Sequence, residues 1–261
     1  MSGTRYAVLL TACVAPNPGV REGLVRSDPA TRLADYKRGL EFWLTLDDPR
    51  VGPVVFVENS GYPLEELREF AESVHLRRRE VEFIGTEMPA PPEGLSYGYS
   101  EFELIAYAHA HSAALAGTSH FIKATGRYTF PYVSRLLRRL PVEFRIAADC
   151  RGARPAGIRP VPTLLTTALL ILEREFYLRD LACLHKSMVP APPWTRKQFI
   201  ECVLYDYLYP RRNEEGIILR WPCNCDPVGV AANGDLLDSP LKRIRYMIRA
   251  FLRWLWPSLW F

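Results

Sequence analysis

Apolar runs alternate with segments of helical periodicity along the first 150 residues of the chain. The apolar runs are short and end at glycine, asparagine or acidic residues, which is typical of buried strands. The segments between them repeat apolar residues at helical spacing, and Asp28 followed by Pro29 is a typical helix start. The pattern predicts strands at 5–14, 52–61, 80–87, 120–130 (with its exit loop) and 142–152, and helices at 28–46, 63–76, 100–117 and 131–140.

The helix predicted at 100–117 has Ser100 as its N-cap, with Glu103 at the spacing of a capping box. Strands separated by helices of this length indicate βαβ units and a mainly parallel sheet. Ligands of such sheets bind outside the carboxyl ends of the strands. One edge of the sheet should therefore carry Thr11, Glu58 to Gly61, Lys123 to Arg127, and Asp149.

The pattern changes after residue 150. A segment rich in proline, glycine and arginine at 152–163 is typical of a connection, and two further helices are predicted at 163–185 and 195–210. The last segment, 240–261, is amphipathic with helical spacing. We therefore expect a single α/β, Rossmann-like domain with a mainly parallel central sheet, a helical C-terminal part and an amphipathic C-terminal helix.

Composition narrows the classes of function without choosing among them. The 261 residues are 48% hydrophobic and 24% charged, with a net charge of +4, which is too weakly basic to indicate nucleic-acid binding. No uncharged run is long enough to span a bilayer, and the scattered cysteines indicate a reduced, cytosolic compartment. Cys223 and Cys225 lack the second pair of ligands that a structural zinc site needs. Dinucleotide, P-loop and serine-hydrolase motifs are missing.

The stretch FIKATGRY at 121–128 ends a predicted strand with two cations on either side of a Thr-Gly pair. One interpretation is that Lys123 and Arg127 face an anion such as a diphosphate. The alternative is that both are solvated loop charges.

The order of these segments resembles that of nucleotide-sugar glycosyltransferases with the GT-A fold. In VVFVENSGYPLEELREFA, Glu58 with Asn59 occupies the place where an acidic strand end meets the nucleoside in that family. The stretch from 98 to 140 follows the family's central layout, and KATGRY is similar to the K-x-T-G-R-Y stretch of bacterial surface-polysaccharide transferases. The resemblance covers roughly residues 5–150, with a weaker similarity at 196–208. It implies binding of a nucleotide-sugar donor.

One departure from the family concerns metal binding. Thr125, Gly126 and Arg127 stand where the family has its D-x-D motif, and these side chains cannot hold Mg²⁺ or Mn²⁺ as two carboxylates would. Lys123 and Arg127 are therefore expected to neutralise the leaving diphosphate directly, so we expect no cofactor. The alternative is a conventional Mg²⁺ or Mn²⁺ enzyme with Asp149 as a ligand.

The resemblance also implies a catalytic base on a helix that follows this region. Glu201, flanked by apolar residues, fits that place, and partial burial would raise its pKa; the alternative is a residue on a polar helix face. Asp149 competes for a catalytic role, or caps a turn. Glu101 is expected to contact the donor sugar or else to serve only the helix N-terminus. Thr11 is placed with the donor-binding residues.

The C-terminal segment combines a cationic row with apolar residues and tryptophans. Its candidate membrane-contacting residues are Arg245, Arg249, Arg253, Trp254 and Trp256, a combination typical of a helix lying in the headgroup region. The alternative is a helix docked on the protein's own core.

Together these features predict a glycosyltransferase, inverting by preference, that uses a nucleotide sugar and a glycan or lipid-linked acceptor in surface-polysaccharide synthesis. Residues 1–150 would bind the donor, 151–238 would bind the acceptor and supply the base, and 239–261 would hold the protein on the inner face of the membrane. The alternative is a sugar-nucleotide-binding or scaffold protein without catalysis.

Overall fold

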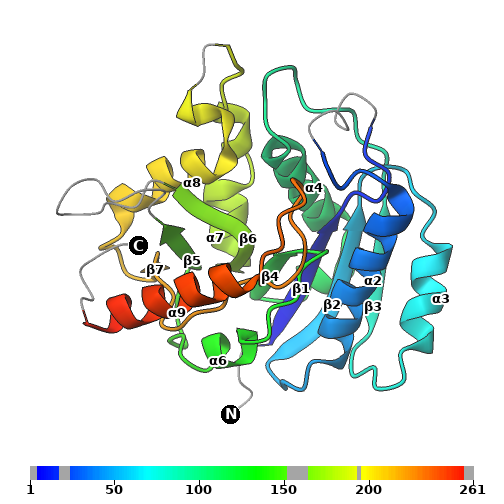
Figure 1. Cartoon of the computed structure of the whole chain (residues 1–261), viewed down its shortest axis with the longest axis horizontal. Helices are drawn as coiled ribbons and strands as arrows, with labels where there is room; N and C mark the ends of the chain where they lie inside the picture. The colour runs from blue at the N-terminus through cyan, green and yellow to red at the C-terminus, as the bar shows by residue number, and fades with distance from the viewer. Residues whose placement is uncertain (1–4, 18–23, 152–163, 193–194, 256–261) are drawn as a thin grey trace.

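The computed structural model describes residues 5–17, 24–151, 164–192 and 195–255. A seven-stranded sheet forms its centre, in the order β3-β2-β1-β4-β6-β5-β7 (Figure 1). The strands are β1 (Tyr6–Ala12), β2 (Val51–Glu58), β3 (Val81–Gly85), β4 (His120–Thr125), β5 (Ile146–Arg151), β6 (Leu164–Glu173) and β7 (Ile217–Ile218).

The sheet is mainly parallel, as the sequence predicts. Strand β1 pairs in parallel with β2 and β4, β2 pairs in parallel with β3, and β5 pairs in parallel with β7. Strand β6 runs antiparallel to both of its neighbours, β4 and β5. The α/β class, the single domain with a mainly parallel central sheet and the C-terminal helix are thereby confirmed.

Helices cover both faces of the sheet. They are α2 (Pro29–Thr45), α3 (Glu65–Ser73), α4 (Gly98–His111), α5 (Ala113–Ala116), α6 (Val133–Leu137), α7 (Arg174–Phe176, continued by a π-helical turn at Tyr177–Leu181), α8 (Ile200–Leu208) and α9 (Pro240–Leu255). Short 3-10 turns occupy Leu184–Ser187, Arg196–Gln198 and Tyr209–Arg211.

Two hydrophobic cores, one on each face, explain why β1 is apolar from Tyr6 to Leu10. Val8 and Leu10 pack into the core shared with α2 and α3, whereas Ala7 and Leu9 pack into the core shared with α4 and α8. Successive side chains of a strand point to opposite faces, so a strand covered on both sides has no polar positions to alternate with.

The helix predicted at 163–185 is wrong over its first half, because residues 164–173 form strand β6. This strand lies inside the sheet, hydrogen-bonded on both sides, and is largely buried. A continuous apolar run is compatible with either a buried helix or a buried strand, and here the two open edges of β4 and β5 decide for the strand.

The predicted start of the 100–117 helix is also wrong. Helix α4 begins at Gly98 after Tyr97, with no side-chain cap, so Ser100 is not its N-cap. A Cβ at Gly98 would lie 2.3 Å from Cγ2 of Ile200, which shows how closely α4 approaches α8. The helix breaks at Ser112, whose hydroxyl accepts a 3.0 Å bond from Leu115 N and starts α5.

The start of α2 is as predicted. The Asp28 carboxylate accepts a 2.7 Å bond from Thr31 N, with Pro29 at the first helical position. The boundaries at residues 150 and 238 stay predictions, although β6 and β7, which follow residue 150, complete the same sheet as β1.

Candidate functional site

The candidate site lies at the carboxyl ends of β1 and β4. Thr11 and Thr125 are side by side in the parallel register, and the turn after β4 is held by a 3.0 Å bond from Gly126 N to Thr11 O. Gly39 of α2 packs directly on this turn, because a Cβ there would lie 2.0 Å from Gly126 O. The predicted donor-binding Gly126 therefore fixes the turn through its backbone.

Glu101, in the first turn of α4, is the centre of a hydrogen-bonded cluster. Its Oε1 accepts bonds from Thr11 Oγ1 at 2.8 Å, Lys123 Nζ at 2.7 Å and Thr125 Oγ1 at 3.4 Å. Its side chain remains 22% exposed. The sequence placed these four residues at the same site, and the structure brings them together as a carboxylate held by the strand ends.

Lys123 does not reach solvent, which corrects the prediction that it contacts a diphosphate. Its residue is fully buried, and its Nζ donates 2.7 Å bonds to Glu101 Oε1 and to the carbonyl of Thr167 on β6. The prediction assumed that the cation stood at the strand tip, whereas Lys123 pairs within β4, two residues before its end.

We predict that Lys123→Met destabilises the protein by roughly 2–4 kcal/mol, because it leaves the Glu101 carboxylate without its buried counter-charge. Chemical denaturation measures this effect. The control is Lys37→Met, whose ion pair with Glu66 is partly exposed, and which should cost at most about 1 kcal/mol. Adding Glu101→Gln to Lys123→Met should restore part of the lost stability. Equal stability of Lys123→Met and the control Lys37→Met would contradict the role of Lys123 as the buried counter-charge of Glu101.

Glu201, in the first turn of α8, lies close to this cluster. The Thr167 hydroxyl donates a 3.3 Å bond to Glu201 Oε1, while the Thr167 carbonyl accepts from Lys123. Burial raises the pKa of Glu201, and the nearby charge of Glu101 raises it further, against the opposing effect of Lys123. A carboxyl group in this environment is suited to exchange a proton nearer to neutral pH than an exposed glutamate.

Two buried arginines form the cationic side of the site. Arg127 is 6% exposed; its hydrogen bonds are long, to Val230 O at 3.4 Å and Tyr128 Oη at 3.5 Å, and its guanidinium lies 5.3 Å from the centre of the Tyr128 ring. Arg32 is 5% exposed and donates to Cys13 O, Arg26 O and Tyr36 Oη, all neutral groups. Neither forms an ion pair within the described part of the chain. Buried cations are normally paired, so this arrangement is suited to an anion supplied by a ligand.

Tyr128 connects the cationic and the acidic sides of the site. Burial raises the pKa of its phenol, Arg127 lowers it, and Glu101 raises it, so both charges act on the same group. Arg32 also lowers it. Arg127, Arg32 and Glu101 therefore all lie near the phenol of Tyr128.

Glu58 is fully buried, and its carboxylate is occupied by the loops around it. It accepts backbone bonds from Val14 at 2.8 Å, Ser60 at 2.9 Å and Tyr62 at 3.2 Å. Burial raises its pKa, and these bonds oppose the rise. Glu58 thus holds the loops after β1 and β2 in place. The neighbouring Asn59 Oδ1 has no hydrogen-bond partner among the described residues. Contact of either residue with a nucleoside stays a prediction.

Asp149 is not placed for catalysis, which corrects the second catalytic assignment and its alternative as a metal ligand. It is fully buried, and its carboxylate pairs at 2.8 Å with both Arg151 and Arg253. Burial alone would raise its pKa, but the two guanidinium groups hold the pKa below its usual value. Asp149 therefore anchors α9 to β5.

The residues at the D-x-D position do not fit a divalent cation. Thr125 and Arg127 offer one hydroxyl and one cation, and the nearby Glu101 oxygen is bound by Lys123. Across residues 5–17, 24–151, 164–192 and 195–255, no three His, Cys, Asp or Glu side chains gather as metal ligands. Catalysis without a metal stays a prediction.

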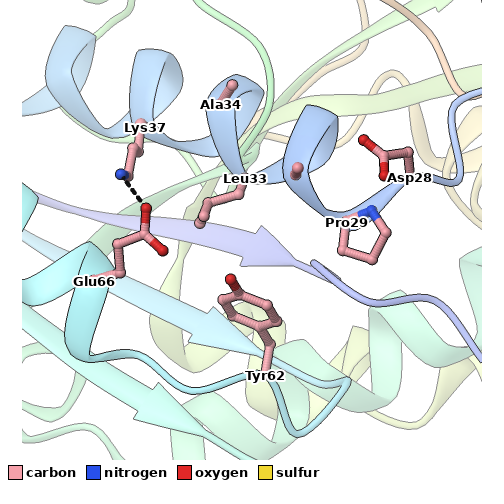
Figure 2. Close-up of a pocket in the computed structure, with 8 residues that line it drawn as sticks. Asp28, Pro29, Leu33, Ala34, Lys37, Tyr62 and Glu66 are labelled. Carbon is pink, nitrogen blue, oxygen red and sulfur yellow. Dashed lines mark hydrogen bonds and ion pairs between the residues drawn. The ribbon is translucent and has the colours of Figure 1, made fainter.

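An open cavity of about 560 Å³ lies elsewhere, between the start of α2 and the loop after β2. Figure 2 shows Tyr62 facing Leu33 across it, with the Lys37–Glu66 ion pair at one end. Its charged groups have local explanations: Asp28 caps α2, and its hydrogen bonds to Thr31 lower its pKa. The chemistry therefore points to the Glu101–Arg127 region instead of to this cavity.

Three residues of the site were missed from the sequence: Arg32, Tyr128 and Thr167. Thr167 was hidden by the helix prediction for 163–185. Arg32 lies in the first turn of α2 and Tyr128 in the loop after β4, so both could have been found as polar residues of a helix start and a loop beside the candidate edge.

No family model and no curated protein sequence matches the chain. Among solved structures, it is similar to a cytidylyltransferase from Leptospira borgpetersenii serovar Hardjo-bovis, with 11% identity over 85% of this chain and 77% of the other, and a TM-score of 0.43. It is also similar to the apo form of glycosyltransferase GlyE from Streptococcus pneumoniae TIGR4, with 10% identity over 83% of this chain and 45% of the other, and a TM-score of 0.42. A third similar structure is mannosyltransferase PcManGT from Pyrobaculum calidifontis in complex with GDP-Man and Mn²⁺, with 11% identity over 97% of this chain and 64% of the other, and a TM-score of 0.46. At such TM-scores and identities the likeness leaves the activity open.

Proposed function

We propose that this protein is a glycosyltransferase that moves a sugar from a nucleotide-sugar donor to a glycan acceptor. The observation that carries the proposal is the pair of buried guanidinium groups, Arg127 and Arg32, without a carboxylate partner among the described residues. Their charges and that of Glu101 act on the phenol of Tyr128, and the charge of Glu101 also acts on Glu201. Such a site offers positive charge for a diphosphate and a base for an acceptor hydroxyl.

In this mechanism Arg127 and Arg32 bind the donor diphosphate and stabilise the charge that grows on it as the glycosidic bond breaks. Glu201 takes the proton of the acceptor hydroxyl as its oxygen attacks the anomeric carbon, which favours inversion. The second oxygen of Glu101, left free by the bonds to Oε1, accepts from a hydroxyl of the donor sugar.

The first test is nucleotide release from candidate donors in the presence of EDTA. We expect release at the same rate with and without EDTA, because cations of the protein take the place of a metal. Loss of release in EDTA would refute the metal-independent mechanism and leave a metal-dependent transferase. A donor that raises the melting temperature by mass action, yet is never turned over, would identify a binding or scaffold protein.

We further propose that the acceptor is linked to a lipid on the inner face of the membrane, as in surface-polysaccharide synthesis. The support is α9, whose outer surface is apolar. No helix of the described residues is both long and apolar enough to cross a bilayer. In this proposal α9 therefore holds the enzyme at the membrane surface.

A further inference from the structure

Helix α9 lies along the outside of the molecule, on the side of the sheet that carries β5 and β7 (Figure 1). Its sixteen residues, Pro240–Leu255, contain both a cationic row and an apolar row. The row that faces away from the protein is the one available to bind a partner.

The cationic row faces the protein. Arg249 forms an ion pair with Asp226, and Arg253 pairs at 2.8 Å with Asp149 of β5. Arg151 bridges the same two aspartates, at 2.8 Å to each. The docked helix is thus held by a network of three arginines and two buried carboxylates.

Two hydrogen bonds from side chains to backbone carbonyls also hold the docked helix. The Asn224 amide donates a 2.7 Å bond to the carbonyl of Tyr246, and the Tyr246 hydroxyl donates a 3.2 Å bond to Leu237 O. Arg249 and Arg253 are therefore committed to the protein, and the prediction that they face lipid headgroups is wrong. Their spacing in the sequence shows that Arg249 and Arg253 lie in one row along the helix. It does not show that Asp226 and Asp149 form ion pairs with them. Trp256 lies outside the described residues.

The apolar row faces outward instead. The exposed fraction is 70% for Met247, 56% for Phe251 and 74% for Trp254. A contiguous apolar surface of this kind on a helix that is otherwise docked marks an interaction surface. Its members are Leu241, Ile244, Met247, Ile248, Phe251, Trp254 and Leu255, which we call the α9 apolar face.

We infer that the α9 apolar face inserts into the interfacial region of a lipid bilayer, and that apolar burial, not headgroup charge, drives the binding. This inference rests on the membrane part of the proposed function and specifies its physics. Because Arg249 and Arg253 are neutralised by Asp226 and Asp149, they add little attraction to anionic lipids.

Two features favour a bilayer over a second copy of the chain. Arg245 is exposed on α9, so a cation that suits a phosphate layer remains on the helix, whereas the exposed Arg243 pairs with Asp238 at 3.0 Å. The chain also continues after Leu255 with the sequence WPSLWF, which extends the apolar and aromatic character typical of interfacial segments.

The experiment measures partitioning of the full chain onto vesicles by co-sedimentation. The vesicles are pure POPC, or POPC with about 30% POPG, at about 0.05 and about 0.5 M NaCl. The variants are Met247→Gln and Phe251→Gln, with Val142→Gln as the control, since Val142 is 82% exposed but lies outside α9. Arg245→Gln tests the remaining charge.

We expect binding to pure POPC that changes less than about threefold with salt. Phe251→Gln should weaken it about tenfold or more, Met247→Gln similarly, and Val142→Gln not at all. Arg245→Gln should leave binding to POPC unchanged.

Binding that requires POPG and disappears at high salt, with both α9 variants equal to wild type, would overturn the inference while keeping the membrane proposal. Absence of binding to either vesicle would overturn both, and a concentration-dependent dimer abolished by Phe251→Gln would then identify a second copy as the occupant. Nucleotide release from a donor in solution, measured on the same variants, tests the transferase separately because Met247 and Phe251 lie outside the candidate site.

Discussion

Glu201→Gln is expected to lower the rate of sugar transfer by roughly a hundred- to ten-thousandfold while leaving donor affinity unchanged. The glutamine keeps the size of the side chain and its contact with the Thr167 hydroxyl, but it cannot take the acceptor proton. Single-turnover transfer and donor titration measure the two effects. The matched control is Asp206→Asn, an exposed carboxylate on the same helix, which should retain full activity.

The pH dependence of sugar transfer gives a second test of the role of Glu201. Because burial raises the pKa of Glu201, transfer should fall with decreasing pH at a higher pH than an ordinary glutamate would cause. A raised folded-state pKa also means that the protonated carboxyl stabilises the fold at low pH, and that this contribution is lost as pH rises through the raised pKa. Glu201→Gln should therefore be at least as stable as wild type at neutral pH.

Two results would contradict this role. One is transfer by Glu201→Gln at a rate near that of wild type. The other is an acidic limb of the pH profile that persists unchanged in the variant.

Arg127→Gln is expected to reduce nucleotide release by roughly a hundred- to a thousandfold and to weaken donor binding, because it removes a positive group from the growing charge of the diphosphate. The same substitution should leave the ligand-free protein as stable as wild type or more so. Arg127 is a buried cation whose two hydrogen bonds, both to neutral groups, are long, so its removal relieves an uncompensated charge.

This opposite response of stability and activity separates a binding role from a structural one. Arg78→Gln is the control, because its side chain is 52% exposed and pairs with Asp47 at the surface; neither quantity should change. A variant of Arg127 that is clearly less stable, yet still binds donor as wild type does, would show that Arg127 serves the fold alone.

Local patterns were sufficient for most of the fold. The start of α2 at Asp28 depends on neighbours within one helical turn, and the apolar runs of β1, β2 and β4 are short and end at turn or polar residues, which is typical of strands. Local patterns could not decide whether segment 164–173 forms a helix or a strand. Its strand state depends on hydrogen bonds with β4 and β5, which lie far away in the sequence.

The candidate site shows the same division. Because parallel strands carry their carboxyl ends to one edge, the sequence placed Thr11, Lys123 and Arg127 together, and the family resemblance added Glu101. It could not tell which cation is free for a ligand, since that depends on partners. Lys123 meets Glu101 and Thr167 across the sheet, whereas Arg127 meets only neutral groups among the described residues.

By itself the sequence determined the α/β class, the edge of the sheet that gathers the polar residues, and the amphipathic character of the last helix. Each follows from spacing along the chain, which local geometry converts directly into faces and ends. Tertiary structure alone decided that β6 is a strand, that Asp149 anchors a helix, and that the arginines of α9 turn inward. These outcomes depend on which charges and open edges meet across long sequence separations, and the free energy of burying them is set only when the partners are in contact.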